Sequence, residues 1–359
     1  MSPGFHAPAR TARIIDRIRK GPTVNHSSLS GGAEQALALV GRHYRCPEPF
    51  PVERTRIREF ARAVQAFHPA HWQEAAAARL GFDAVVAPPT FAAVVWQQAR
   101  REILEQLITG YRLDRIVHVD QTLDIGRPLL AGDLLTCEVY FESFRHFRSF
   151  DVLTVTAVLT DQHGVAVQTG STALLARTGA PDDSSGRAPV ARAGFAEPDP
   201  VIATGLRHTR LPRTRIDFDR LTVDTRLPAA ATIVRSGDLA NYARTVCDPS
   251  DGLIRPGTPG DTPPLVAPGM LVLALAAGYV TSWTRDPAAV TKYRAEFANH
   301  VHYLTVPRLD DAEIEFSGRV VARDQRRRTA TVAIEAKSQG RKLFGYASAE
   351  VSFAAPVAR

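Results

Sequence analysis

The sequence has few cysteines and none of the paired spacings that hold metal ions or disulfide frameworks. Cys46, Cys137 and Cys247 each stand alone, without a CxxC spacing. This excludes a disulfide scaffold and fits a reducing compartment. The sequence also has no Walker motif and no glycine-rich fingerprint after a predicted strand. We therefore expect no metal site and no redox cofactor.

Long apolar runs are also missing. The longest apolar stretch lies around residues 270–280, which is too short to cross a bilayer and predicts a buried core helix. Arginines near the N-terminus are not followed by an apolar run, so no signal peptide is expected. Together these features predict a cytoplasmic protein without a membrane partner.

Lysine is scarce, although the net charge is +7 and the pI about 9.6. Lysine occurs only at positions 20, 292, 337 and 342, so nearly all of the positive charge comes from arginine. A GC-rich genome explains this usage without any function. The functional alternative is a surface for an anionic partner such as a phosphorylated carrier. Nucleic acid is not expected, because the basic residues are dispersed and form no platform with aromatic residues.

Hydrophobic periodicity predicts helices followed by strands in the first half. Ile57, Phe60, Ala61 and Val64 have the spacing of one buried helical face, which predicts a helix over residues 53–65. A second helix is expected over 72–80. A long apolar helix runs from about 87 to 108, with prolines at its entry. The composition then predicts strands over 116–125, 134–143, 152–160 and 165–177.

The same order recurs in the second half, which indicates two α+β units. Ser236 is expected to cap a helix, and a second long apolar helix is expected over 267–283. Strands are predicted over 294–302, 312–323, 329–338 and 342–353. The predicted organisation is a flexible N-terminal arm (1–35), a first domain (36–178), a Pro/Gly/Ser-rich linker (179–205) and a second domain (206–355).

The two halves form an internal repeat. Apolar residues of the first helix pair at one constant offset with those of the second half, as Ile57 with Leu239 and Phe60 with Tyr242. Each unit leaves a sheet face that a like unit could cover. The repeat therefore predicts a pseudo-dimer within one chain, and leaves further association into a homo-oligomer open.

Motifs in both halves resemble the MaoC-like, fused (3R)-hydroxyacyl-carrier-protein dehydratase family. In the first half these are Val40-Gly-Arg-His-Tyr44, Glu53-Arg-Thr-Arg-Ile-Arg-Glu-Phe-Ala61, Ala87-Pro-Pro-Thr-Phe91, Val119-Asp-Gln-Thr-Leu123 and Ala131-Gly-Asp133. In the second half they are Gly278-Tyr-Val-Thr-Ser-Trp283, Asp286-Pro-Ala-Ala-Val-Thr291 and Phe344-Gly-Tyr-Ala347. The resemblance covers roughly residues 36–177 and 206–353. It implies an α+β double hotdog, in which each long helix is wrapped by a curled antiparallel sheet.

The resemblance also implies a chemistry. The family adds or removes water across the 2,3 bond of an acyl thioester, carried on the phosphopantetheine of acyl carrier protein or of coenzyme A. Its active-site loop usually reads Asp-x-Asn-Pro-x-His. A histidine can move the proton near neutral pH, and the first N–H groups of the long helix can stabilise the thioester oxygen.

Each half of this chain has kept only part of that loop. In Ala66-Phe-His-Pro-Ala-His71 the Pro and the His match, but Ala66 replaces the Asp. In Asp248-Pro-Ser-Asp-Gly-Leu253 the Asp matches, but Leu253 replaces the His. Neither half has a complete Asp–His pair, so the resemblance implies a non-standard active site.

Three functions are compatible with this departure. The first is a hydratase or dehydratase of enoyl or 3-hydroxyacyl thioesters that uses His71 alone. The second is a related lyase that adds an amine such as glycine to an enoyl thioester, giving a β-amino acyl unit for natural-product biosynthesis. The third is a non-catalytic protein that binds acyl thioesters.

His71 is the predicted acid–base residue, because it matches the family histidine. His68 either faces the same pocket or caps the loop, and Asp248 is either a retained carboxylate or the remnant of a lost site. Thr90 and Gly269 lie at the starts of the two long helices, where their N–H groups could bind a developing oxyanion.

A polar strand in the second half is the remaining candidate. Strand alternation places Glu296, His300 and His302 on one face. This face is either simply solvated or forms a patch at the pocket mouth for the ammonium or carboxylate of a second substrate. No cysteine or carboxylate pair accompanies these histidines, so no metal is expected there.

Overall fold

The structure is a computed structural model that describes residues 31–111, 116–147, 150–177, 206, 212–246, 265–297 and 303–354. The predicted linker lies outside the described residues, as does most of the predicted arm. Helix α2 (Gly31–Leu39) begins inside the range predicted for that arm. Among the described residues, no helix combines the length and apolar character that a membrane span requires.

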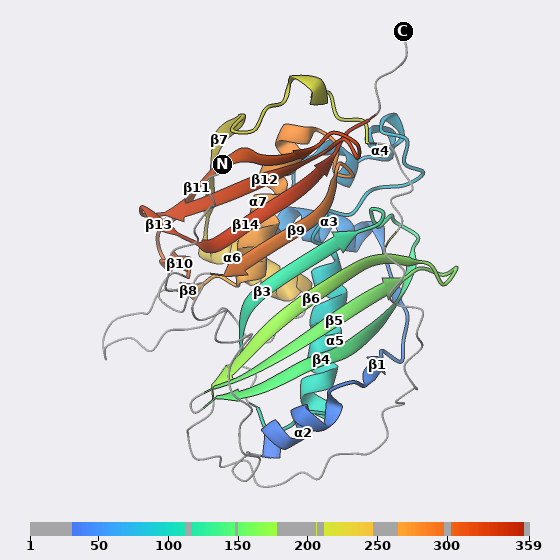
Figure 1. Ribbon diagram of the computed structural model, residues 1–359, viewed down its shortest axis with the longest axis vertical. Coiled ribbons are helices and arrows are strands. Elements are labelled where there is room, and N and C mark those ends of the chain that lie inside the picture. Colours follow the sequence, from blue (N-terminus) through green and yellow to red (C-terminus); the bar gives the residue numbers. More distant parts are fainter. Residues whose placement is uncertain are drawn as a thin grey trace.

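The first unit is built of helices followed by four long antiparallel strands (Figure 1). Its elements after α2 are β1 (His43–Arg45), β2 (Phe50–Pro51), α3 (Arg54–Ala63), the 3-10 helix η2 (Pro69–His71), α4 (Glu74–Arg79), α5 (Ala92–Gln106), β3 (Ile116–Ile125), β4 (Leu134–Phe147), β5 (Phe150–Thr160) and β6 (Ala166–Arg177).

The second unit repeats this plan, and the strand at its start pairs at the sheet edge as β1 does in the first unit. Its elements are the 3-10 helix η5 (Phe218–Arg220), β7 (Arg226–Val234), α6 (Ser236–Val246), β8 (Leu265–Val266), α7 (Gly269–Thr284), β9 (Val290–Phe297), β10 (Thr305–Val306), β11 (Ala312–Asp324), β12 (Thr329–Ser338), β13 (Arg341–Lys342) and β14 (Phe344–Ser352).

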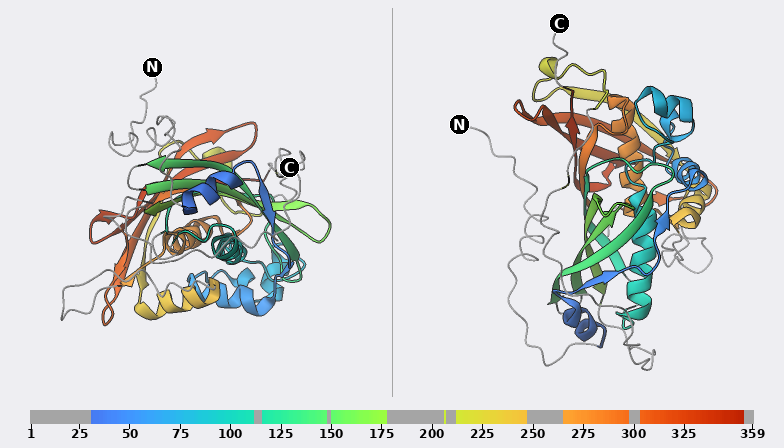
Figure 2. Two further views of the ribbon diagram at one scale, coloured as in Figure 1. Left: turned by 90° about the horizontal axis from the view of Figure 1, so that it is seen from below. Right: turned by 90° about the vertical axis from the view of Figure 1, so that its right-hand side faces the viewer.

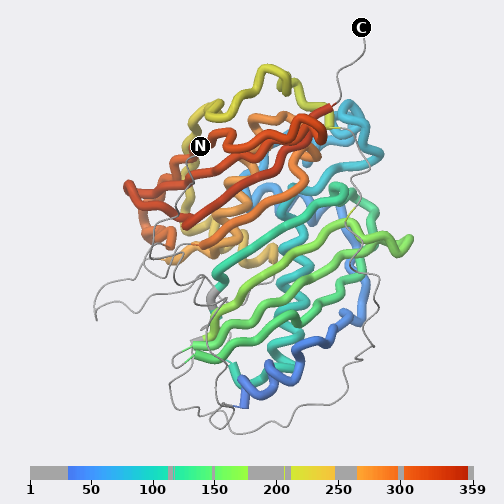
Figure 3. Tube along the Cα trace, in the orientation of Figure 1, coloured from blue at the N-terminus to red at the C-terminus, as the bar shows by residue number. Residues whose placement is uncertain are grey.

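One continuous sheet joins the two units (Figure 3). Its strand order is β1-β4-β5-β6-β3-β9-β14-β12-β11-β7. Strands β3 and β9, which follow the long helices of the two units, pair antiparallel, with Asp120 opposite Glu296 and Asp124 opposite Lys292. Lys292 Nζ lies 2.8 Å from an Asp124 carboxylate oxygen, so an ion pair crosses this seam. The predicted pseudo-dimer is therefore a single sheet with two wrapped helices.

The long helices α5 and α7 lie beneath the concave face of the sheet (Figure 2, left). Helices α3 and α6 pack against each other, and α6 also contacts α5. The repeat-related residues Phe60 and Tyr242 meet across this contact, with ring centroids 6.3 Å apart. Both side chains are at most 1% exposed, so the predicted helical faces form part of one shared core. The α+β double-hotdog prediction is confirmed.

Three local predictions differ from the structure. Strand β7 was not predicted; it is an edge strand with a proline and an alanine run, and it pairs with β11. Strand β9 begins at Val290, four residues before the predicted start, because Val290 pairs with Val351 of β14. Ser236 donates its hydroxyl to the Arg308 carbonyl, and the N–H before helix α6 is instead bound by Asp238.

Candidate functional site

His71 lies at the end of η2 and is 1% exposed. Its Nδ1 lies 2.7 Å from the carbonyl oxygen of Val86, and a carbonyl can only accept, so Nδ1 carries the proton. The lone pair of the neutral ring is therefore on Nε2. Burial, together with nearby His68, lowers the pKa of His71 to about 4, although the bond to Val86 opposes this shift.

His68 has both ring nitrogens engaged. Nδ1 accepts the N–H of Ala70 at 3.3 Å, which caps η2, and Nε2 donates to the Arg285 carbonyl of the second unit at 3.3 Å. Burial lowers the pKa of His68, while the backbone bond to Arg285 opposes the shift. The ring centroids of His68 and His71 are 5.7 Å apart. His68 thus caps the loop and ties it to the end of α7.

The buried neutral His71 makes stability depend on pH. Its folded pKa of about 4 lies below the ordinary 6.5, so the unfolded chain binds this proton more readily between those values. The stabilisation is complete above pH 6.5 and is lost as the pH falls towards 4, by roughly 3 kcal/mol. We expect His71→Asn, which can still donate to Val86, to flatten denaturant-derived stability over this range. An unchanged pH slope would contradict the buried neutral assignment.

The two predicted oxyanion donors have different surroundings. Thr90 is 1% exposed and precedes α5, where its carbonyl accepts the N–H of Ala93. Gly269 is the first residue of α7, and among the described residues no side chain caps that helix at Pro268. The first N–H groups of a helix have no partner within it. The N-terminus of α7 can therefore donate to an oxyanion.

A pocket lies between α5 and the sheet of the first unit. It encloses about 670 Å³ of free space, its opening included. One face of α5, from Ala93 to Leu104, forms one wall, which is about 16 Å long at 1.5 Å per residue. Strands β3 to β6 form the opposite wall, and Met270 from the first turn of α7 completes the lining.

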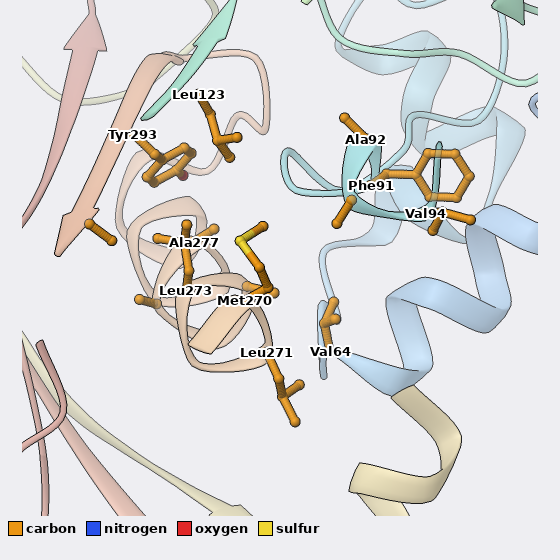
Figure 4. Packing of buried hydrophobic residues seen from close by; sticks show 14 of the residues in the cluster. Val64, Phe91, Ala92, Val94, Leu123, Met270, Leu271, Leu273, Ala277 and Tyr293 are labelled. Carbon is orange, nitrogen blue, oxygen red and sulfur yellow. The ribbon is translucent and has the colours of Figure 1, made fainter. Parts of the chain in front are cut away.

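The surroundings of Met270 connect the two units. Figure 4 shows Met270 and Leu271 of α7 in the same part of the core as Leu123 of β3 and Ala92 at the start of α5. The pocket therefore belongs mainly to the first unit, but it reaches the N-terminus of α7 in the second. The matching interior of the second unit holds aromatic side chains: Tyr279 stacks on Phe316 at 5.6 Å, and Tyr293 is fully buried.

His118 is a pocket residue that the sequence interpretation missed. Strict alternation from the buried Leu123 and Gln121 would turn position 118 to the outer face of β3. A register shift between His118 and Asp120 interrupts the alternation, and His118 lines the pocket instead. The histidine directly before Val119-Asp-Gln was visible in the sequence, but nothing in its local pattern indicated the bulge.

Three predicted site residues that the structure describes are not brought to this pocket. His71 and His68 do not line it. Glu296 lies on the face of β9 opposite the buried Ala295 and Phe297, where Arg294 is 3.3 Å away. Asp248, His300 and His302 lie outside the described residues.

Known proteins resemble this chain along its first half and along its whole length. A family model described as "FAS1-like, dehydratase domain region" matches residues 38–170. A UPF0336 protein of Mycobacterium tuberculosis is 37% identical over 142 residues, which are 40% of this chain and 86% of that protein. A Mycobacterium leprae UPF0336 protein is 36% identical over 141 residues, or 39% of this chain and 89% of that protein.

Solved structures extend the similarity to both units. A conserved hypothetical Mycobacterium tuberculosis protein with a double hotdog fold is 14% identical; the match covers 87% of this chain and 96% of that one, with a TM-score of 0.57. This defines the present chain as a double-hotdog protein. A MaoC-like dehydratase is 32% identical, with a TM-score of 0.73, and the match covers 89% of this chain and all of that one. The chain belongs to the MaoC-like hydratase/dehydratase family.

Proposed function

We propose that the chain is a lyase that acts across the 2,3 bond of an enoyl or (3R)-hydroxyacyl thioester, with the acyl chain held in the first-unit pocket. The observation that carries this proposal is the pocket itself, since an apolar space along α5 meets the uncapped start of α7. Apolar walls favour a hydrocarbon chain, and helix N–H groups favour the oxygen that becomes negative during the reaction.

The thioester end of the substrate would lie near Gly269, with its carbonyl oxygen towards the first N–H groups of α7. Polarising this carbonyl withdraws electrons from the 2,3 double bond and activates C3 for attack. The substrate would be carried on the phosphopantetheine of acyl carrier protein or coenzyme A. Arg100 lines the pocket and is half-buried, so it adds a positive charge beside the acyl site.

Water and an amine would use the same acceptor, so both remain part of the proposal as nucleophiles. The predicted role of Glu296 in binding a second substrate has no support from its position on the outer face of β9. An amine such as glycine would instead have to approach C3 within the pocket. A non-catalytic acyl-thioester binder would use the same apolar walls without turnover.

One incubation separates these functions. The full chain is mixed with trans-2-octenoyl-pantetheine thioester, with and without glycine, and the products are followed by mass spectrometry. We expect gain of one water, or of one glycine where glycine is present. Binding of the saturated octanoyl thioester is measured in parallel by calorimetry. Binding without either adduct would overturn the lyase proposal in favour of the binder.

A further inference from the structure

The first-unit pocket contains two polar atoms that have no hydrogen-bond partner among the described residues. They are Nε2 of His118 and Nε1 of Trp96, and both atoms are buried. Unpaired buried polar groups are costly, so each calls for an explanation, such as a catalytic role or a bound group that pairs with it. The indole N–H can only donate, whereas a neutral imidazole can accept at the nitrogen that lacks a proton.

The surroundings of His118 hold the ring at the edge of the α7 N-terminus. Its ring packs on Phe297, with centroids 5.0 Å apart. The same Phe297 ring fills the space beside Gly269, where an added Cβ would come within 2.6 Å of it. Phe297 therefore links the imidazole directly to the first residue of α7, and Met270 of that turn lines the pocket with His118.

The charge state of His118 follows from the groups around it. Burial and the positive charge of Arg100 lower its pKa to about 3, while a backbone hydrogen bond with Asp120 and the Gln121 side chain oppose the shift. The Gln121 side chain is fixed in turn: its amide nitrogen donates to the Thr122 carbonyl at 2.9 Å, and its oxygen accepts from Thr172 at 2.8 Å. The imidazole is thus neutral at neutral pH, with its orientation constrained.

We propose that His118 is the proton-transfer residue of the lyase, acting through Nε2 on the nucleophile at C3. This inference rests on the proposed function, and it assigns the acid–base role to His118 instead of His71. Three geometric facts carry it. His118 lines the pocket, its buried Nε2 has no partner within the described part of the chain, and its ring packs on Phe297, which fills the space beside Gly269.

The proton and electron balance is complete without a further reactant. As the water oxygen bonds to C3, one water proton moves to Nε2 and the π electrons of the 2,3 bond shift to the thioester oxygen. The enolate forms at the N-terminus of α7. The imidazolium then gives its proton to C2 as the enolate collapses, which restores the neutral ring. With an amine nucleophile, nitrogen bonds to C3 and one N–H proton follows the same path.

The test replaces His118 with a residue of similar shape that cannot carry a proton at this pH. We expect His118→Asn to lower kcat about 100-fold, while the Kd for octanoyl-pantetheine thioester stays within about 3-fold of wild type. His118→Ala should be similarly impaired and should regain part of its turnover when imidazole is added to the assay. Rescue by imidazole distinguishes proton transfer from a packing role.

A matched control is available in the same unit. His43 is 4% exposed and also has a ring nitrogen, Nδ1, without a partner among the described residues, but it stacks on Tyr140 outside the pocket. His43→Asn should keep wild-type turnover. His71→Asn is measured alongside it.

The outcomes separate the two proposals. If wild type and His118→Asn turn over at similar rates, the role of His118 is overturned, but the proposed lyase function is not. A loss confined to His71→Asn would return the acid–base role to the loop histidine. Absence of turnover in wild type with either nucleophile would overturn the proposed function, and the role of His118 with it.

Discussion

Replacing Gly269 with alanine is expected to lower kcat about 100- to 1,000-fold, the range for loss of an oxyanion donor. The added Cβ would lie 2.6 Å from the Phe297 ring, closer than real Cβ contacts allow. That ring is 8% exposed and is held by His118 on one side and Phe344 on the other, so it cannot yield easily. The first turn of α7 must shift instead, and its N–H groups shift with it. Steady-state kinetics with octenoyl-pantetheine thioester measure the loss.

The same helix provides the control. Apart from the backbone of α7 itself, no atom of the described residues lies within 4 Å of a Cβ added at Gly278, so Gly278→Ala should keep full turnover. It should also stabilise the chain by about 0.5–1 kcal/mol, because alanine favours a helix interior over glycine. If the clash is the cause of the loss, Phe297→Leu should restore part of the activity to Gly269→Ala. Full activity in Gly269→Ala would show that the α7 N-terminus does not hold the reacting oxygen.

Replacing Ala157 with phenylalanine is expected to change which acyl chains the enzyme accepts. Ala157 lines the pocket from β5, and a larger side chain there would occupy space that the distal carbons need. Octenoyl has four more carbons than crotonyl, worth about 3 kcal/mol if all are buried at about 0.8 kcal/mol each. The ratio of kcat/KM for octenoyl to that for crotonyl thioester should therefore fall about 100-fold.

Thr154 is the matched position on the same strand. It alternates with the pocket-lining Leu153 and Val155, so its side chain faces away from the pocket. Thr154→Phe should leave the octenoyl-to-crotonyl ratio unchanged. An unchanged ratio in Ala157→Phe, with the fold intact by circular dichroism, would place the acyl chain elsewhere.

Much of the fold could be predicted from the sequence because buried faces repeat at the period of each element. Strands β3 and β12 have the predicted bounds. The repeat-related residues Ile57 and Leu239 indicated two helices, α3 and α6, which pack against each other. Strand β7, the longest of the strands that were not predicted, is stabilised by its pairing with β11 rather than by its own composition. An edge strand with exposed alanines carries almost no alternation to detect.

The site was less predictable because it depends on contacts between residues that are far apart in the sequence. The loop around His71 could be recognised from its residues, yet only the structure shows the Val86 carbonyl and the second-unit Arg285 closing around it. His118 reaches the pocket through an interrupted register, and a strict period of two assigns it to the wrong face. The pocket lining also includes Met270, which is far from α5 in the sequence.

The pairing of β3 with β9 also determines how the specific activity of the protein depends on its concentration. In separate subunits, a pocket wall and an oxyanion-binding helix would part on dilution, and activity per molecule would fall. Here both belong to one chain and one hydrogen-bonded sheet, so their effective concentration is fixed by covalent connection. Specific activity should thus be independent of enzyme concentration.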